Sequence, residues 1–280
     1  MSPVKNYFPY IWAACHGAGV GLLYWFLQGS FHDGGLVLFT LSVSVVAIVH
    51  LPILYKHWNV IVKKGPLLRG LLFGSTQICF FEALAKTSAA AALTAGTIGT
   101  LFGIGLGMVL LGEVLKPRQR LGLVAAEIGI LLNLDGIYLG WAAVIGGLFQ
   151  GSFTVLTRKY MRDRVPAHQA NAVMFIVSSL VCIAYLSFTY TPGNIFIFRM
   201  EKVLMFAALI SSVHYSLCYI YRHLDTQKVA VLTLTRLPAT GFADWIGYGV
   251  LLSPFQWGSI GFAMLGAAIV ALGDSRLFRK

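Results

Sequence analysis

Apolar residues fill ten long stretches of this chain, and short polar segments separate them. A helix needs about 20 mostly apolar residues to cross the hydrocarbon core of a bilayer, and each stretch comes close to that length. We therefore predict an all-α integral membrane protein with ten transmembrane helices. The predicted spans are 11–28, 35–54, 67–85, 88–111, 120–136, 138–157, 168–188, 202–221, 228–251 and 255–273.

The basic residues lie almost entirely in alternate connections between these stretches. Of the 21 Lys and Arg residues, three fall on one side (Lys86, Arg199 and Lys202), Arg236 falls inside a span, and the remainder fall on the other side. Positive loops are retained in the cytoplasm, so we expect both termini to be cytoplasmic. The basic residues of the predicted cytoplasmic side are Lys5, Lys56, Lys63, Lys64, Arg69, Lys116, Arg118, Arg120, Arg158, Lys159, Arg162, Arg164, Arg222, Lys228, Arg276, Arg279 and Lys280.

Composition agrees with a bilayer as the solvent, since 58% of the residues are hydrophobic and 11% are charged. A water-soluble chain of 280 residues needs more polar covering than this. The net charge of +11 lies in short, separated loops beside helices, as topology and anionic lipid headgroups require. We therefore expect membrane lipids and no nucleic acid as partners, and a location in the cell (inner) membrane.

Patterns for metal, disulfide or nucleotide chemistry are missing from the sequence. Its four cysteines form no CxxC pair, and its histidines have no metal-ligand spacing. No GxxxxGK[ST] loop occurs. We predict that the protein uses no metal and no cofactor, and that ATP does not drive it within this chain.

Two sequence patterns occur in both halves of the chain. Residues 12–17, Trp-Ala-Ala-Cys-His-Gly, recur in part at 141–146, which is 129 positions later. We therefore predict a first repeat at 1–136 and a second at 137–280, with five spans each. An odd number of spans makes the second repeat enter from the opposite face, and inverted repeats can expose a midplane site to each side in turn. The second pattern, at an offset of 137 positions, matches Gly112, Pro117, Gln119 and Gly129 with Gly249, Pro254, Gln256 and Gly266.

Residues 83–92, the Leu-Leu-Gly-Glu-Val-Leu run at 110–115 and Gly122 together resemble the EamA-type repeat of the drug/metabolite transporter superfamily. The resemblance covers nearly the whole chain. It implies a ten-helix transporter whose central cavity is lined mainly by spans 1, 3, 4, 6, 8 and 9. One departure is that Val250 stands where the second half would match Glu113, so any role of this acid exists in one half only.

Polar side chains inside spans should face a cavity or a partner, because exposure to lipid is costly. Arg236, Thr240 and Asp244 follow one another at four-residue spacing around Pro238 in span nine. Either they bind or couple to a substrate, or Arg236 forms a structural ion pair with Glu82 or Asp244. The predicted substrate-binding residues are Gln77, Gln150, Ser211, His214, Tyr215, Arg236, Thr240 and Asp244.

Three further residues are candidates for proton coupling or gating. Glu82 lies in span three, and intramembrane carboxylates commonly carry protons in transporters; the alternative is a structural partner of Arg236 or Lys86. His16 lies in span one, where a histidine either donates a hydrogen bond between helices or acts as a proton relay, since a free imidazole titrates near neutral pH. Glu113 lies at the cytoplasmic end of span four, where it forms either a helix-end charge pair with its basic neighbours or a gating contact.

Small residues recur every four positions along span four, at Ala91, Ala95, Gly99, Gly103 and Gly107. Such a groove lets a neighbouring helix approach closely. The alternative is a flexible helix that faces the substrate. Two glycines of span six, at 147 and 151, have the same two interpretations.

The leading hypothesis is a secondary active transporter of a small organic metabolite or drug-like molecule, coupled to protons or working by exchange. An intramembrane enzyme that acts on a lipid-linked substrate is an alternative, although no nucleophile and base lie at useful spacing. A membrane partner protein that transports nothing is another. A homodimer is compatible with each of these hypotheses.

Overall fold

The computed structural model describes residues 7–29, 34–57, 64–87, 89–114, 116–132, 141–189, 199–249 and 253–273. Every regular element in these ranges is a helix, so the predicted all-α class is confirmed for them. The elements are α1 (Phe8–Gly29), α2 (Gly35–Lys56), α4 (Lys64–Leu84), α5 (Ala89–Gly96), α6 (Ile98–Leu111), α7 (Pro117–Leu131), α9 (Trp141–Arg162), α10 (Ala167–Thr189), α11 (Met200–His223), α12 (Thr226–Leu232), η3 (Thr233–Thr235), α13 (Arg236–Tyr248) and α14 (Pro254–Gly273).

The helices coincide with the predicted apolar stretches, and two stretches are interrupted. The first break lies at Thr97, between α5 and α6, and the second is the short 3₁₀ turn η3 between α12 and α13. Four helical segments are long and apolar enough to cross a membrane by length and composition alone. The count of ten spans and their sidedness stay predictions. The four segments are Gly35–Lys56, Gly65–Leu84, Ala167–Thr189 and Met200–His223.

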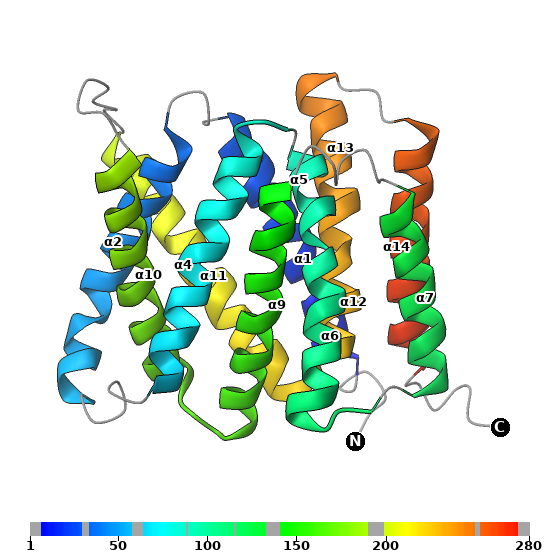
Figure 1. Cartoon of the computed structure of the whole chain (residues 1–280), viewed down its shortest axis with the longest axis horizontal. Coiled ribbons are helices and arrows are strands. Elements are labelled where there is room, and N and C mark those ends of the chain that lie inside the picture. The colour runs from blue at the N-terminus through cyan, green and yellow to red at the C-terminus, as the bar shows by residue number, and fades with distance from the viewer. Residues whose placement is uncertain are drawn as a thin grey trace.

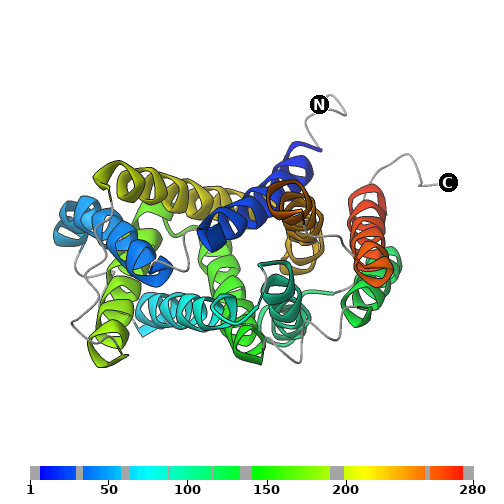
Figure 2. The ribbon, with the colours of Figure 1, turned by 90° about the horizontal axis from the view of Figure 1, so that it is seen from above.

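The helices run roughly along one common direction (Figure 1). Helix α1 begins and α14 ends at the same end of the bundle, the lower end in that view. Seen from above, α2 and α10 lie toward one end of an elongated bundle, and α7 pairs with α14 at the other (Figure 2). Helices α1, α6, α9 and α12–α13 lie between them.

Large apolar side chains cover much of the outer surface. Val49 in α2 is 68% exposed, Val109 in α6 is 80% exposed and Ile246 in α13 is 79% exposed. A protein surrounded by water avoids extended apolar surface of this kind. Lipid acyl chains solvate it without penalty, which agrees with a membrane location.

The helix ends repeat across the two halves of the chain. Gly112 ends α6 and Gly249 ends α13, 137 positions later, and each has φ of 66°. Glycine reaches this left-handed conformation without steric penalty, so it is suited to end a helix. Helix α7 then begins with the amide of Lys116 donating to Gln119 Oε1 over 2.9 Å. Helix α14 begins in the same way, with the amide of Ser253 donating to the Gln256 side chain over 2.7 Å.

Helices α7 and α14 approach each other through small residues. A Cβ atom at Gly122 would come within 2.9 Å of the Gly266 carbonyl, and one at Gly129 within 2.8 Å of the Ser259 carbonyl. Ser259 lies 137 positions after Gly122, and Gly266 lies 137 positions after Gly129. The two contacts therefore exchange equivalent residues, as a twofold relation between two helices requires.

Helix α6 crosses α9 through the predicted groove of small residues. A Cβ at Gly99 would collide with the backbone of Gly147, and one at Gly151 would collide with the carbonyl of Gly99. Gly103 faces Gly151 at the next turn. Close helix packing, one of the two interpretations of this groove, therefore describes the contact. The side chain of Ala91 lies outside the described residues.

Helix α1 crosses the start of α13 in the same manner. A Cβ at Gly21 would collide with the backbone carbonyl of Arg236 and come within 2.7 Å of the Thr240 hydroxyl. Arg236 and Thr240 lie 137 positions after Gly99 and Gly103, the offset that relates the helix ends. At this offset Arg236 corresponds to Gly99, so a glycine of α1 packs on Arg236 and glycines of α9 pack on the corresponding position of α6.

The sequence-based assignment of one basic residue to the cytoplasmic loops is wrong. Arg69, which the sequence places in a cytoplasmic connection, lies inside α4 with 0% exposure. It therefore contributes to packing rather than to a solvated loop. Val250, the predicted counterpart of Glu113, lies outside the described residues, as do Lys5, Lys63, Arg276, Arg279 and Lys280.

Candidate functional site

A cavity of about 110 Å³ lies at the centre of the bundle. Its walls come from α1, α4, α6, α9, α11 and the α12–α13 region, with Phe39 of α2 in addition. Apart from Phe39, these are the spans that the family resemblance implies. Its polar lining includes His16, Gln77, Gln150, Thr154, His214 and Arg236.

Aromatic rings form much of the remaining wall, among them Phe39, Phe73, Phe80 and Phe153. The imidazole of His214 packs edge-on against Phe73, with ring centroids 4.4 Å apart and planes 72° apart. Its Nδ1 lies 2.8 Å from the Ile210 carbonyl, which anchors the ring to its own helix. The cavity is therefore mainly apolar with a few polar groups, the usual make-up of a small-molecule site.

Five of the predicted site residues meet at this cavity: His16, Gln77, Gln150, His214 and Arg236. They come from α1, α4, α9, α11 and α13, so the fold brings together residues up to 220 positions apart in the sequence. His16 is held by a contact of 3.2 Å between its Nδ1 and the Ser216 hydroxyl. Whether these residues bind a substrate stays a prediction.

The other predicted substrate-binding residues do not line the cavity. Tyr215 turns toward α2, where its hydroxyl lies 3.0 Å from His50 Nε2. The Thr240 hydroxyl donates to the backbone carbonyl of Arg236 over 2.8 Å, so it supports the cavity wall from behind. Asp244 is buried at 2% exposure in α13, and Ser211 is half-buried in α11.

Glu82 also lies away from the cavity. Its carboxylate accepts a hydrogen bond of 2.6 Å from the hydroxyl of Tyr185 in α10. The partner is thus Tyr185 rather than Arg236 or Lys86, the two structural partners considered from the sequence. Glu82 is half-buried, so a role in coupling would act through α4 and not by contact with a bound molecule.

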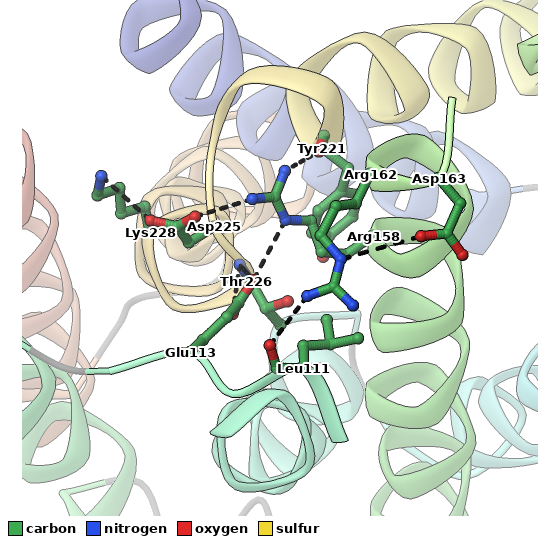
Figure 3. Close-up of polar contacts among 9 residues, drawn as sticks. All are labelled: Leu111, Glu113, Arg158, Arg162, Asp163, Tyr221, Asp225, Thr226 and Lys228. Carbon is green, nitrogen blue, oxygen red and sulfur yellow. Dashed lines mark hydrogen bonds and ion pairs between the residues drawn. The ribbon is translucent and has the colours of Figure 1, made fainter. Parts of the chain in front are cut away.

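Glu113 joins a cluster of charged residues (Figure 3), at the end of the bundle where α6 and α9 end, the lower end in Figure 1. Its carboxylate accepts a hydrogen bond of 3.2 Å from Arg158 Nε in α9. It also accepts the backbone N–H of Thr226, 3.0 Å away, at the start of α12. The Glu113 carboxylate therefore ties the ends of three helices together. The side chain of Arg118 lies outside the described residues.

Arg158 is the centre of this cluster. Its guanidinium donates to Asp225 over 2.8 Å and to the backbone carbonyl of Tyr221. Lys228 adds a second cation, 3.3 Å from Asp225. The cluster thus holds two cations and two anions, and its charges balance. Tyr221 and Thr226, which it holds in place, also line the cavity.

Arg69 is the main residue that the sequence analysis missed. Its Nε donates to Thr157 over 2.9 Å, and its terminal nitrogens donate to the Ala170 carbonyl over 2.8 Å and to Asn171 over 3.0 Å. Among the described residues no carboxylate pairs with it. Its guanidinium carbon lies 5.0 Å from the ring centroid of Phe153, so a cation stands directly behind the cavity wall.

The signal for Arg69 was present in the sequence but ambiguous. Arg69 lies at the edge of a predicted span, where a loop charge and a buried charge look the same. Arg158 and Asp225 gave no signal of their own, because nothing local shows that a loop cation and a loop anion face each other.

Comparison with known protein families shows what part of this chain resembles. Residues 138–272 match the EamA-like transporter family. That family is part of the drug/metabolite transporter superfamily, so the resemblance noted from the sequence is confirmed. The matched residues span nearly all of the predicted second repeat.

A solved structure shares its fold with nearly the whole chain. A crystal structure described only as that of a protein has a TM-score of 0.70, with 17% sequence identity, 99% of this chain covered and 100% of its own. At this identity the likeness shows the fold alone. Among curated proteins no sequence matches significantly. The second half of the chain is therefore similar to a family of membrane transporters.

Proposed function

We propose that this protein is a secondary active transporter that moves a small organic metabolite or drug-like molecule by alternating access. In this proposal ten spans form two inverted repeats, 1–136 and 137–280. The protein lies in the cell (inner) membrane with both termini cytoplasmic.

The observation that carries the proposal is that two helix crossings border the same cavity, and that each joins a helix of the first repeat to a helix of the second. Gly99 and Gly151 belong to the α6–α9 crossing, and Gly17 and Arg236 belong to the α1–α13 region. All four line the cavity. Alternating access needs two units of similar build that can exchange conformations around a shared site, and this arrangement supports such an exchange.

The charged cluster around Arg158 supports a gate at one end. It joins α6, α9 and the α11–α12 connection at the end where α1 begins and α14 ends, which the sequence predicts to be cytoplasmic. In this proposal the cluster closes the cytoplasmic side, and separation of Arg158 from Glu113 and Asp225 opens it. Glu113 thereby has the gating role that was one of its two interpretations.

Coupling to protons or exchange needs a titratable group that senses the cavity or the gate. His16 and His214 face the cavity. Glu82 remains the carboxylate candidate. Replacement of Glu82 by Gln should abolish uptake driven by an imposed pH gradient and should leave the rate of solute exchange unchanged. Glu201→Gln is the control, because that side chain is 70% exposed, and it should change neither uptake nor exchange.

Uptake and counterflow measurements with the purified protein in liposomes test the transport proposal. The solutes are first selected from a metabolite panel by the rise in melting temperature that a ligand of the native state must cause. Gln150→Leu, in the cavity wall, should reduce flux, and Gln169→Leu, at a position outside the wall, serves as the matched control. If no solute that stabilises the protein crosses the membrane, the transport proposal is wrong.

The same measurement separates the alternatives. An intramembrane enzyme would return a chemically altered compound, which mass spectrometry of the liposome contents would detect. A partner protein would bind without flux or conversion. Membrane lipids and a second copy of the chain remain expected partners, to be checked by lipid analysis and by mass measurement in detergent.

A further inference from the structure

Helix α12 is a short element between two breaks in the helices of the chain. A short connection separates it from the end of α11 at His223, and the 3₁₀ turn η3 separates it from α13. Three of its residues, Thr226, Val229 and Ala230, line the cavity. A 3₁₀ stretch inside a helix often marks a hinge. A rotation of α12 about η3 would therefore change the wall of the cavity at this end.

The beginning of α12 is held by groups from outside the helix (Figure 3). Asp225 directly precedes α12 and makes no side-chain cap of its own. Its carboxylate instead binds Arg158 of α9 over 2.8 Å and Lys228 over 3.3 Å. The N–H of Thr226 is accepted by Glu113, which follows α6. Separation of α12 from α6 and α9 thus requires that the contacts with Glu113 and Arg158 break.

Two polar groups in the first turn of α12 have no hydrogen-bond partner within the described part of the chain. They are the hydroxyl of Thr226 and the side-chain amide nitrogen of Gln227. Both residues are buried, with exposed fractions of 1% and 2%. A buried polar group without a partner destabilises the state in which it is buried, because it has lost its hydrogen bonds to water. Thr226 and Gln227 therefore oppose the packing of α12 that Glu113 and Arg158 stabilise.

The hydroxyl of Thr226 is enclosed by α6 rather than by a polar partner. A Cβ atom at Gly107 of α6 would lie 3.4 Å from this hydroxyl oxygen and 3.2 Å from Oε2 of Glu113. Because Gly107 has no side chain, the first turn of α12 packs closely on α6. Movement of α12 away from α6 would expose the hydroxyl to water.

The first half of the chain has the same helix break without the two polar groups. Thr97 separates α5 from α6, and Leu234, the middle residue of η3, lies 137 positions after it. At the same offset, Ala89 and Ala90 correspond to the two residues whose polar groups lack partners. The two groups belong to the second half alone, so we expect them to affect opening at one end of the bundle.

We propose that α12 is the moving element of the gate at this end and that it turns about η3. The Thr226 hydroxyl and the Gln227 amide favour opening, because water satisfies them only when α12 leaves α6 and α9. The charged cluster around Arg158 favours closure, so the two effects oppose each other in the closed state. The inference rests on the proposed function only in that the cavity opens toward this end of the bundle.

Variants of similar shape without the polar groups test the inference first by stability. Thr226→Val and Gln227→Met should each raise the melting temperature of the detergent-solubilised protein by about 2 °C or more, because each removes a group that is buried without a partner. Thr76→Val is the matched control. The Thr76 hydroxyl is also buried but donates to the Leu72 carbonyl over 2.8 Å, so its loss should not raise the melting temperature.

A cysteine in the cavity wall then measures opening. Thr154 of α9 lines the cavity, and Thr154→Cys is combined with each variant in inside-out membrane vesicles. Labelling by the membrane-impermeant reagent 2-sulfonatoethyl methanethiosulfonate is followed, and the chain without Thr154→Cys gives the background from the native cysteines. Thr226→Val and Gln227→Met should each slow labelling from the cytoplasmic side about fivefold, because the closed state is stabilised. Glu113→Gln should accelerate it.

Labelling of the same cysteine from the opposite side, in right-side-out vesicles, is the second control. It should not slow in Thr226→Val or Gln227→Met, because the two polar groups act at the other end. A decrease by the same factor from both sides would show that the variants alter the cavity itself, and the inference would be wrong.

The inference is also overturned if Thr226→Val and Gln227→Met lower the melting temperature, if they leave labelling from the cytoplasmic side unchanged, or if Glu113→Gln does not accelerate that labelling. If Thr226→Val fails to fold, Gln227→Met decides the question, since Gln227 does not line the cavity. Flux in liposomes is judged separately. Transport of a solute with unchanged labelling would refute the gate and uphold transport, whereas the expected labelling without flux of any solute would uphold the gate and refute transport.

Discussion

Arg236 occupies the position in the second half of the chain that Gly99 occupies in the first. Gly21 of α1 packs against Arg236, as Gly151 of α9 packs against Gly99, and both contacts are backbone to backbone. Both close approaches are possible because Arg236, like Gly99, is contacted there through its backbone. The side chain of Arg236 lines the cavity. The second half of the chain thus has an arginine in the wall where the first half has a glycine.

Gly99→Ala should lower the free energy of unfolding by about 2 kcal/mol or more, since overpacking against rigid neighbours costs about 1–3 kcal/mol. The added Cβ would meet the backbone of Gly147, which cannot move aside as a flexible side chain can. Gly105→Ala on the same helix is the control, because no atom lies within 4 Å of its Cβ position. Melting temperatures in detergent compare the two, and equal values would contradict the packing described for α6 and α9.

Gln119→Ala and Gln256→Ala should each destabilise the protein by about 1 kcal/mol, the usual value of a helix N-terminal cap. Each Gln accepts the backbone N–H that precedes its helix, at Lys116 and Ser253. Losses that add in the double variant are expected for separate sites. Thermal unfolding of the single and double variants measures these losses of stability. If only one of the two single variants is destabilised, the two caps are not equivalent.

Glu113→Gln should destabilise the protein by about 1–3 kcal/mol, because a buried charged hydrogen-bond partner is removed. Its side chain is 9% exposed, whereas that of Asp225 is 42% exposed. Asp225→Asn is therefore expected to cost less, within about 1 kcal/mol for a solvated pair. Melting curves at low and high salt compare the two variants. A larger loss of stability for Asp225→Asn than for Glu113→Gln would show that Asp225 contributes more to the stability of the cluster.

Arg69→Lys should destabilise the protein by about 3 kcal/mol or more, since a buried cation loses most of its partners. An ammonium cannot reach Thr157, Ala170 and Asn171 at once with the planar fork of a guanidinium. Arg199→Lys makes the same change at an exposed site and should have no effect. Unfolding followed by intrinsic fluorescence measures the stability of the two variants. If Arg69→Lys is as stable as the unaltered protein, the planar guanidinium of Arg69 is not needed for stability.

Much of the fold was predictable from the sequence because it depends on local patterns. Apolar length located the helices, and the spacing of small residues located the α6 groove. Matched Gly, Pro and Gln positions in the two halves became matched helix caps. The breaks at Thr97 and at Thr233–Thr235 were not predicted, since the apolar pattern continues through them.

The candidate site was predictable only in part. Polar residues inside spans were the right kind of signal, and His16, Gln77, Gln150, His214 and Arg236 all reached the cavity wall. The same signal also selected Tyr215, which faces α2 through His50. Depth in a span does not reveal the direction of a side chain around its helix, so such residues could not be separated.

The sequence by itself determined that the chain is an all-α membrane protein and which residues form its helices, because apolar length and helical spacing are properties of neighbouring residues. Only the tertiary structure decided that Arg69 is buried and that Glu113 binds Arg158. The physical reason is that the energy of a charge depends on the groups around it. Those groups come from helices far apart in the sequence.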